Sequence, residues 1–174
     1  QNFISEDYGL TCAYSQPMGN GYFSLLGGVS YQTIEYELTS NGGLGGLRRT
    51  LVSDEAFAWR AGIAYELPQY ALRASLIYNS QIDYEMAGSV SLSNVPGATA
   101  VSGDISMPQS LEFKAKSGVA PGWLAFGSVK WTDWSVTDNM PLCASGVANC
   151  TMATATSALT LLWDDTWTVT LGAV

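Results

Sequence analysis

The chain contains no histidine, and only 13% of its 174 residues are charged. Histidine is the commonest general base and metal ligand, so its absence excludes a Ser-His-Asp or Cys-His catalytic arrangement within this chain. Soluble domains average roughly 25% charged residues. No apolar run approaches the roughly 20 residues that a spanning helix needs. High apolar content without such a run favours a transmembrane β-barrel, and a secreted all-β domain is the alternative.

Positive charge is also scarce, because seven Lys and Arg stand against fifteen Asp and Glu. A chain without a basic surface cannot neutralise phosphates, so nucleic acid is not expected as a partner. No metal or other cofactor is expected either. The adjacent acidic pairs, Asp54-Glu55 and Asp164-Asp165, are interpreted as solvated turn residues, since no loop has the ligand spacing of a calcium site.

Three cysteines remain. Cys143 and Cys150 enclose six small or polar residues, which predicts a loop disulfide in an oxidising compartment. Zinc is disfavoured because neither a histidine nor a second cysteine pair could complete four ligands. Cys12 lies on an apolar face between Leu10 and Tyr14 and is interpreted as a small buried hydrophobe.

Apolar and polar side chains alternate along several segments of the chain with a period of two residues. Between Phe57 and Glu66 the odd residues are apolar or aromatic, whereas Arg60 and Glu66 lie among the even ones. Such a strand must place its apolar face in a dry environment. That environment is a core in a soluble sandwich and lipid in an outer-membrane barrel, whose charged face would line a lumen.

Turn signals alternate between short and long connections, the rhythm of a bacterial barrel with tight periplasmic turns and larger external loops. The short ones include Gln16–Asn20, Glu66–Gln69 and Val119–Gly122, and a fourth is read at Trp163–Thr166. Eight strands are therefore predicted, over residues 6–15, 21–38, 55–66, 70–86, 105–118, 122–136, 157–163 and 167–174.

Aromatic residues form two bands at opposite strand ends, as interfacial girdles do. A sandwich would concentrate them in mid-strand, so the bands favour the membrane barrel. One band flanks the short turns and the other lies toward the long loops: Tyr14, Tyr22, Tyr65, Tyr70, Trp123, Trp163 and Trp167, then Tyr31, Trp59, Tyr78, Tyr84, Phe113 and Trp131.

The opposite face of the strands is predicted to line the lumen. It carries charges of both signs, which suggests salt bridging across a narrow or plugged interior. Leu124 and Phe126 also point inward if Trp123 and Trp131 face lipid. The predicted lumen charges are Glu35, Glu37, Arg60, Glu66, Arg73, Asp83, Glu85, Glu112, Lys114, Lys116 and Lys130.

Three stretches resemble the outer-membrane long-chain fatty acid transporter (FadL) family, which includes aromatic-hydrocarbon transporters. They are Trp59–Leu67 running on to Ser75–Ser80, Met107–Glu112 with Ser117–Trp123, and Val129–Ser135. The resemblance covers residues 55–174 well and 1–54 loosely. It implies a Gram-negative outer-membrane protein that is not an enzyme, with a fourteen-stranded barrel plugged by an N-terminal hatch.

The resemblance also implies passive diffusion of hydrophobic compounds, either long-chain fatty acids or hydrocarbons, with release sideways through the wall. Residues 1–174 are expected to form part of a single barrel domain, because about eight strands, no hatch and no closing aromatic strand are recognised. The implied partners are outer-membrane lipid, lipopolysaccharide and a hydrophobic small molecule, and the implied state is a monomer.

Basic residues that could hold a ligand carboxylate are Arg60, Arg73, Lys114, Lys116 and Lys130, beside the inward Leu124 and Phe126. Each basic residue could instead pair with Glu66, Asp83, Glu85 or Glu112. Leu44 and Leu47 are candidates for an apolar capture groove in the long loops, against ordinary loop packing. A small closed barrel of eight strands that binds without transporting is the alternative function. The preferred substrate stays open.

Overall fold

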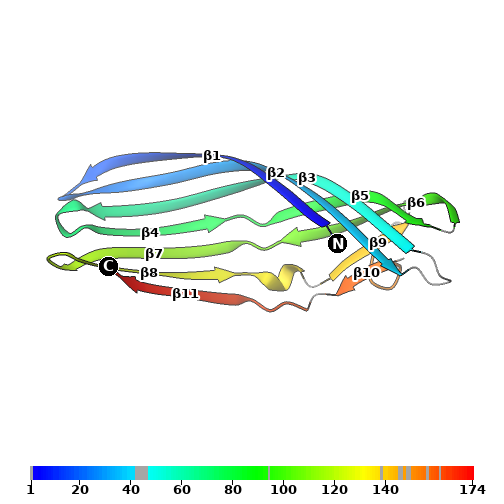
Figure 1. The fold of residues 1–174 in the computed structure, drawn as a ribbon. Helices are drawn as coiled ribbons and strands as arrows, with labels where there is room; N and C mark the ends of the chain where they lie inside the picture. Colours follow the sequence, from blue (N-terminus) through cyan, green and yellow to red (C-terminus); the bar gives the residue numbers. More distant parts are fainter. Residues whose placement is uncertain are drawn as a thin grey trace.

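The computed structural model describes residues 2–41, 47–93, 95–137, 139–144, 147, 150–155, 157–160 and 162–174. Within these ranges all strand pairings are antiparallel, and no helix is long and apolar enough to cross a bilayer. The strands are β1 (Asn2–Met18), β2 (Gly21–Asn41), β3 (Leu47–Leu67), β4 (Leu72–Asn79), β5 (Ile82–Leu92), β6 (Val95–Met107), β7 (Ser110–Ala120), β8 (Trp123–Thr132), β9 (Asn139–Ala144), β10 (Ser157–Thr160) and β11 (Thr166–Ala173), with short 3₁₀ turns η1 (Pro68–Tyr70) and η2 (Trp134–Thr137) (Figure 1).

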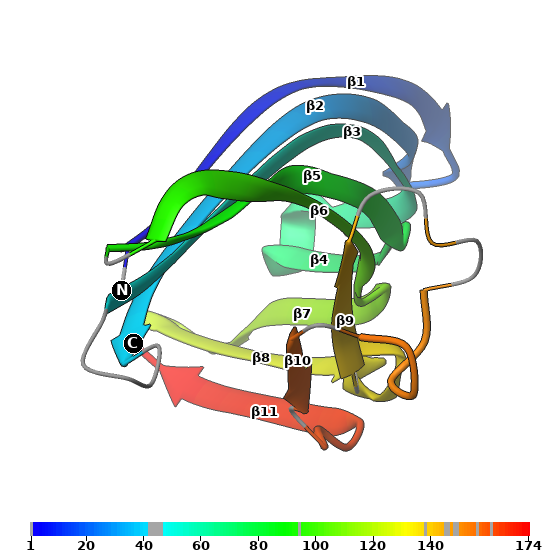
Figure 2. The same ribbon diagram turned by 90° about the vertical axis from the view of Figure 1, so that its right-hand side faces the viewer.

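The strands form one strongly curved sheet, with β1 and β11 at its two ends (Figure 2). The hydrogen-bonded order is β10-β9-β6-β5-β3-β4-β7-β8-β11, and β2 and β1 continue from the other side of β3. Among the described residues β1 pairs only with β2 and β11 only with β8, so this sheet does not close on itself. The prediction of an all-β antiparallel architecture is confirmed, and the closed eight-stranded barrel is not what the chain forms.

The chain runs from one end of the barrel wall to the other several times, and we call each run a pass. Four of the passes consist of two strands separated by a short break, and the four breaks lie at the same level. Strands β4 and β5 run in one direction and are separated only by Ser80 and Gln81, and β6 and β7 only by Pro108 and Gln109. Likewise β9 continues β8 beyond η2, and β11 continues β10. With the unbroken β1, β2 and β3 this makes seven passes. The strand predicted at 167–174 is present as β11, but the hairpin turn predicted at Trp163–Thr166 is wrong, because β10 and β11 pair with β9 and β8 and not with each other.

The break between β4 and β5 also reverses which residues face inward. We call the face that carries Val52 and Arg60 of β3 the inner face. Asn79 and Ile82 both lie on it although they are three residues apart, because the break between β4 and β5 adds one residue. One extra residue moves every following side chain to the other face.

Four of the predicted lumen charges lie on the outer face instead, two of them because of this reversal. Asp83 and Glu85 lie on the outer face of β5, because Tyr84 and Met86 occupy its inner face and are 2% and 1% exposed. In the unbroken β2, Ser24 and Ile34 face inward, so Glu35 and Glu37 face outward, and Glu37 pairs with Arg49 at 2.7 Å. The predicted position of Tyr84 in an interfacial band is wrong for the same reason.

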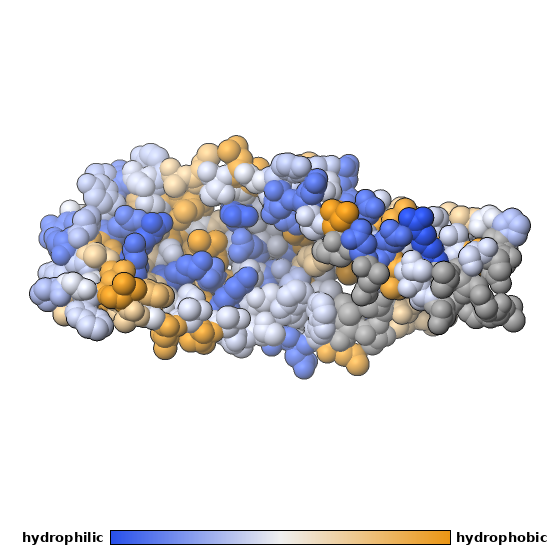
Figure 3. Space-filling model, viewed as in Figure 1, coloured by the Kyte–Doolittle hydropathy of each residue, from blue (hydrophilic) through white to orange (hydrophobic). Residues whose placement is uncertain are grey.

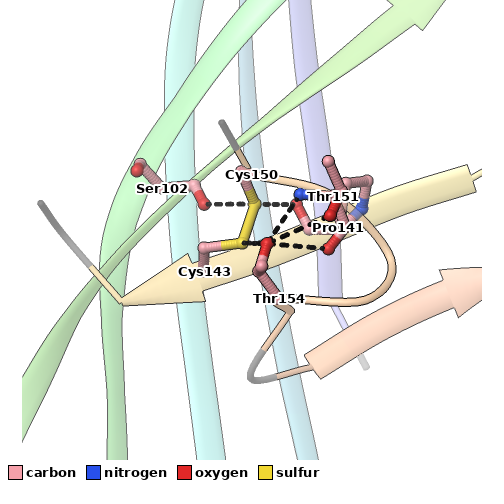
Figure 4. Close-up of a disulfide and its surroundings, with 6 residues drawn as sticks. All are labelled: Ser102, Pro141, Cys143, Cys150, Thr151 and Thr154. Atoms are coloured by element: carbon pink, nitrogen blue, oxygen red, sulfur yellow. Dashed lines mark hydrogen bonds between the residues drawn. A yellow bond between two sulfur atoms is a disulfide. The ribbon is translucent and has the colours of Figure 1, made fainter. Parts of the chain in front are cut away.

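The predicted disulfide between Cys143 and Cys150 is confirmed (Figure 4). It links β9 to the segment that follows, and the Sγ atom of Cys150 lies 3.5 Å from the carbonyl oxygen of Pro141. The interpretation of Cys12 as buried is wrong. Cys12 is exposed on the outer face of β1, opposite Gly27 of β2.

Candidate functional site: the inner face and the gap in the wall

The inner face below the strand breaks, toward the short turns, is polar and basic. The registers pair Glu66 with Arg73, Arg73 with Lys116, and Glu112 with Lys130, and residues paired in an antiparallel ladder share a face. Hydrophilic side chains accordingly spread over the middle of the molecule in its left-hand half, and hydrophobic ones gather toward the margins (Figure 3). The predicted inward positions of the five basic residues are therefore confirmed.

A cavity of about 500 Å³ lies on this basic part of the inner face. It brings together Arg73, Lys114 and Lys116 with the apolar Leu124 and Phe126, and thus collects five of the predicted ligand residues. The other two basic candidates, Arg60 and Lys130, share the inner face but do not line the cavity. Leu44 and the side chain of Leu47 lie outside the described residues. The remaining lining residues are Ser75, Ile77, Ala115, Gly127, Ser128 and Thr170.

Two of the basic residues in this cavity are engaged in ion pairs. Arg73 lies 3.2 Å from Glu66 and Lys114 lies 3.0 Å from Glu112. Within the described part of the chain Lys116 forms no ion pair, although it stands opposite the like-charged Arg73 in the ladder. The cavity therefore combines an unbalanced positive charge with an apolar wall, the chemistry that suits an amphiphilic anion.

Above the breaks, toward the long loops, the inner face is apolar. Its buried residues come from five neighbouring strands, β2, β3, β5, β6 and β9, so the curved sheet packs onto itself there. The Tyr84 hydroxyl donates to Oε1 of Gln32 at 3.0 Å, across β3 at the position of the small Ala56. The buried cluster is Ile34, Val52, Ala56, Tyr84, Met86, Val101 and Leu142.

Beside this cluster the wall of the sheet has a gap in its hydrogen-bond ladder. Strand β3 pairs with β5 up to Ser53 and with β4 from Arg60, which leaves residues 54–59 and 80–86 unpaired with each other in the ladder. The gap is bounded by Ser80 N donating to the Trp59 carbonyl at 2.9 Å, and by Glu85 N donating to Oδ2 of Asp54 at 2.6 Å.

A cavity of about 390 Å³ opens at the gap. Four carboxylates line it, from Asp54, Glu55, Asp83 and Glu85, beside Ala56, Phe57 and Gln81. Alternation alone does not predict this feature, because residues 70–86 read as one regular strand. The only signal in the sequence is the polar Ser80-Gln81 pair inside an otherwise alternating segment.

A chain of hydrogen bonds joins the strand breaks to one another. Gln109 accepts from the Tyr78 hydroxyl at 2.6 Å and donates to Oδ2 of Asp133 at 2.8 Å. Ser135 donates to Oδ1 of Asp133 at 2.9 Å, and its backbone N–H reaches Asp165 at 3.3 Å. Hydrogen bonds from Gln109 and Ser135 hold the pKa of Asp133, which follows β8, below its usual range.

The outer face below the breaks is apolar and aromatic. Trp59 and Tyr78 contact each other with ring centroids 5.2 Å apart, and Tyr31 contacts Phe57 at 5.3 Å. Exposed side chains of this kind would be costly in water over so large an area, and lipid is the environment that accommodates them. Further exposed members are Tyr8, Leu10, Tyr14, Leu25, Val29, Ile63, Phe113, Trp123, Trp167, Val169 and Leu171.

Comparisons with known proteins agree with this arrangement. The family described as "Outer membrane protein transport protein (OMPP1/FadL/TodX)" matches residues 15–174. A crystal structure of a Pseudomonas aeruginosa FadL homologue is similar to the chain, with a TM-score of 0.71 and 18% sequence identity over 98% of this chain and 46% of that chain. The chain thus spans about half the length of that protein, and no curated protein matches it. The chain therefore belongs to the FadL/TodX family of outer-membrane transport proteins, β-barrel proteins of the outer membrane that are not enzymes.

Proposed function

We propose that the barrel of which this chain is a part carries hydrophobic compounds through the outer membrane by passive diffusion and releases them sideways into the lipid. The observation that supports this proposal is the gap beside the apolar inner cluster, because the cavity at the gap is lined both by Ala56 of that cluster and by outer-face residues such as Asp83 and Glu85. Family membership supports transport as the general activity.

The basic cavity on the inner face is the proposed holding site for a polar head group. Lys116, which has no ion pair among the described residues, would attract an anionic group, with Arg73 beside it. Leu124 and Phe126 would contact the alkyl or aromatic part of the ligand. A hydrocarbon would need only the apolar contacts, so the dependence of transport on Lys116 separates the two substrate classes.

The gap between β3 and the β4–β5 pass is the proposed exit. Its rim of four carboxylates repels anions at neutral pH and leaves uncharged molecules unaffected. A fatty acid would therefore cross this rim in its protonated form, whereas a hydrocarbon would cross without a change of charge.

Uptake by intact cells that lack their own transporter and express the full-length parent protein tests the proposal. Labelled oleate, an alkylbenzene and a small sugar are compared, and saturable uptake of either apolar compound without the sugar is expected. Uptake of the sugar alone would indicate an open pore, and no uptake by folded protein would refute transport.

A blocking experiment tests the exit separately. Gln81→Cys places a thiol in the gap, and Ala100→Cys places one on the outer face of β6, away from it. Modification with a bulky, membrane-impermeant maleimide should abolish uptake only in Gln81→Cys. Equal uptake by both labelled variants would exclude the gap as the exit.

A further inference from the structure

A third cavity lies where the break between β10 and β11 packs against the break between β8 and β9. It measures about 490 Å³ and is lined by Trp134, Leu162, Trp163, Asp164, Asp165 and Thr166. Both walls are held in place by the ladder, because Trp131 pairs with Trp167 and Thr132 with Thr166 immediately below. Neither the inner basic cavity nor the gap in β3 shares a residue with it.

The two tryptophans form a corner of this cavity. The rings of Trp134 and Trp163 lie 4.9 Å apart between centroids at an interplanar angle of 88°, so they present walls at right angles. Aromatic faces attract ammonium groups, and perpendicular aromatic walls are how proteins enclose alkylated ammonium ligands.

Two carboxylates complete the cavity, and none of its lining residues is basic. Asp165 is fixed by hydrogen bonds from Nε1 of Trp131 at 3.2 Å and from the Ser135 backbone at 3.3 Å. Asp164 makes no hydrogen bond or ion pair within the described structure, so its full charge faces the cavity.

The backbone at the rim is strained. Leu162 has a φ of +50°, and it is one of only two non-glycine residues with a positive φ in the described part of the chain. Such conformations persist where the surroundings fix them and concentrate at binding sites. Directly below the cavity, the outer faces of β8 and β11 carry Val129 and Val169, which face each other in the ladder.

We propose that this cavity binds the alkylammonium head group of an amphiphile, whose tail lies along the apolar outer face of β8 and β11. The aromatic corner and the carboxylates favour a positive charge, and the apolar outer face of β8 and β11 below them, with Val129 and Val169, favours a hydrocarbon chain. The ligand is either a membrane lipid with an ammonium head group or a diffusible cationic amphiphile. This site does not depend on the proposed route of transport.

Calorimetric titration of the full-length parent protein in phosphatidylglycerol nanodiscs tests the proposal. The probes are choline and its uncharged isostere 3,3-dimethylbutan-1-ol, which have the same shape. Choline should bind, and the alcohol should bind at least about tenfold more weakly because it lacks the charge that the aromatic faces and carboxylates attract. Equal binding of both probes would overturn the proposal.

Variants assign the binding to this cavity. Trp163→Leu should weaken choline binding about tenfold and Asp164→Asn about threefold or more, with the alcohol unaffected by Asp164→Asn. The matched controls are Trp123→Leu, at the opposite end of β8, and Asp104→Asn, on the outer face of β6. Losses of the same size in variants and controls would refute the site. Adding phosphatidylethanolamine to the discs then distinguishes the two kinds of ligand. If this lipid competes with choline, the natural ligand is a membrane lipid; if it does not compete, the natural ligand is a diffusible cation that uses the same site.

Discussion

Truncation of Met86 tests the reversal of faces at the strand breaks. Met86 is 1% exposed and lies in the inner cluster with Val52, Tyr84 and Val101, whereas its neighbour Glu85 is exposed on the outer face. Full burial of a methionine side chain contributes about 1.5–3 kcal/mol through transfer from water. Because the surroundings collapse only partly, the remaining cavity adds to this, and we expect Met86→Ala to lower the free energy of unfolding by about 2–5 kcal/mol.

Glu85→Ala is the matched control, since only the backbone N–H of Glu85 makes a described contact, with Asp54. We expect its effect to stay within about 0.5 kcal/mol. The assay is urea unfolding of the full-length parent protein in lipid vesicles, followed by tryptophan fluorescence. If alternation continued through residues 80–81 as the sequence suggested, Glu85 would face inward and Met86 outward. Equal effects, or a larger effect of Glu85→Ala, would therefore refute the assignment of faces.

Three further predictions concern other parts of the chain. Replacing both Cys143 and Cys150 by Ser should lower the free energy of unfolding by about 2.5 kcal/mol, the chain-entropy value for so short a loop, and reduction of the parent should reproduce the shift of the urea midpoint. Cys12 should react in intact cells with a lipid-soluble maleimide and resist a water-soluble one, because its outer-face position lies among lipid-facing residues, and the reverse pattern would contradict that position. The lowered pKa of Asp133 means that its hydrogen bonds stabilise the ionised form, so this stabilisation is complete above the ordinary aspartate pKa of about 3.9 and is lost as pH falls through the lowered value. The thermal midpoints of the parent and Gln109→Leu should accordingly differ most at neutral pH and converge in acid. A difference independent of pH would show that the hydrogen bond from Gln109 to ionised Asp133 does not account for the stabilisation.

Much of the sheet below the strand breaks, toward the short turns, could be predicted from the sequence. Residues 57–66 and 123–131 alternate without interruption, so the inward positions of Arg60, Leu124 and Phe126 followed from periodicity alone. The predicted disulfide rested on composition and spacing, which are local properties. Features within one unbroken strand or one short loop are thus accessible from a single sequence.

The sheet above the strand breaks, toward the long loops, could not be predicted, because its geometry depends on which strands pair and in which register. The extra residue at Ser80-Gln81 changes the face of Asp83 only if β5 pairs with β6 in the observed register. Nothing local distinguishes a strand break at Trp163–Thr166 from a hairpin turn, since both use polar residues beside aromatics. The ladder partners of β10 and β11 decide between them. The gap in the wall was missed for the same reason, since it exists only between two strands.

The reversal at the breaks explains how one sheet can serve two environments. Below the breaks the charges of Arg73 and Lys116 face inward and aromatic residues such as Trp59 face lipid; above them Tyr84 and Met86 face inward and Asp83 faces outward. Regular alternation through Ser80 and Gln81 would have turned Asp83 and Glu85 inward and Tyr84 and Met86 outward, and would have removed both apolar side chains from the inner cluster. A single added residue in a pass moves its apolar side chains from lipid to the interior, and the same insertion interrupts the ladder beside β3. The inward positions of Tyr84 and Met86 in the apolar cluster and the gap next to it are therefore two consequences of one added residue.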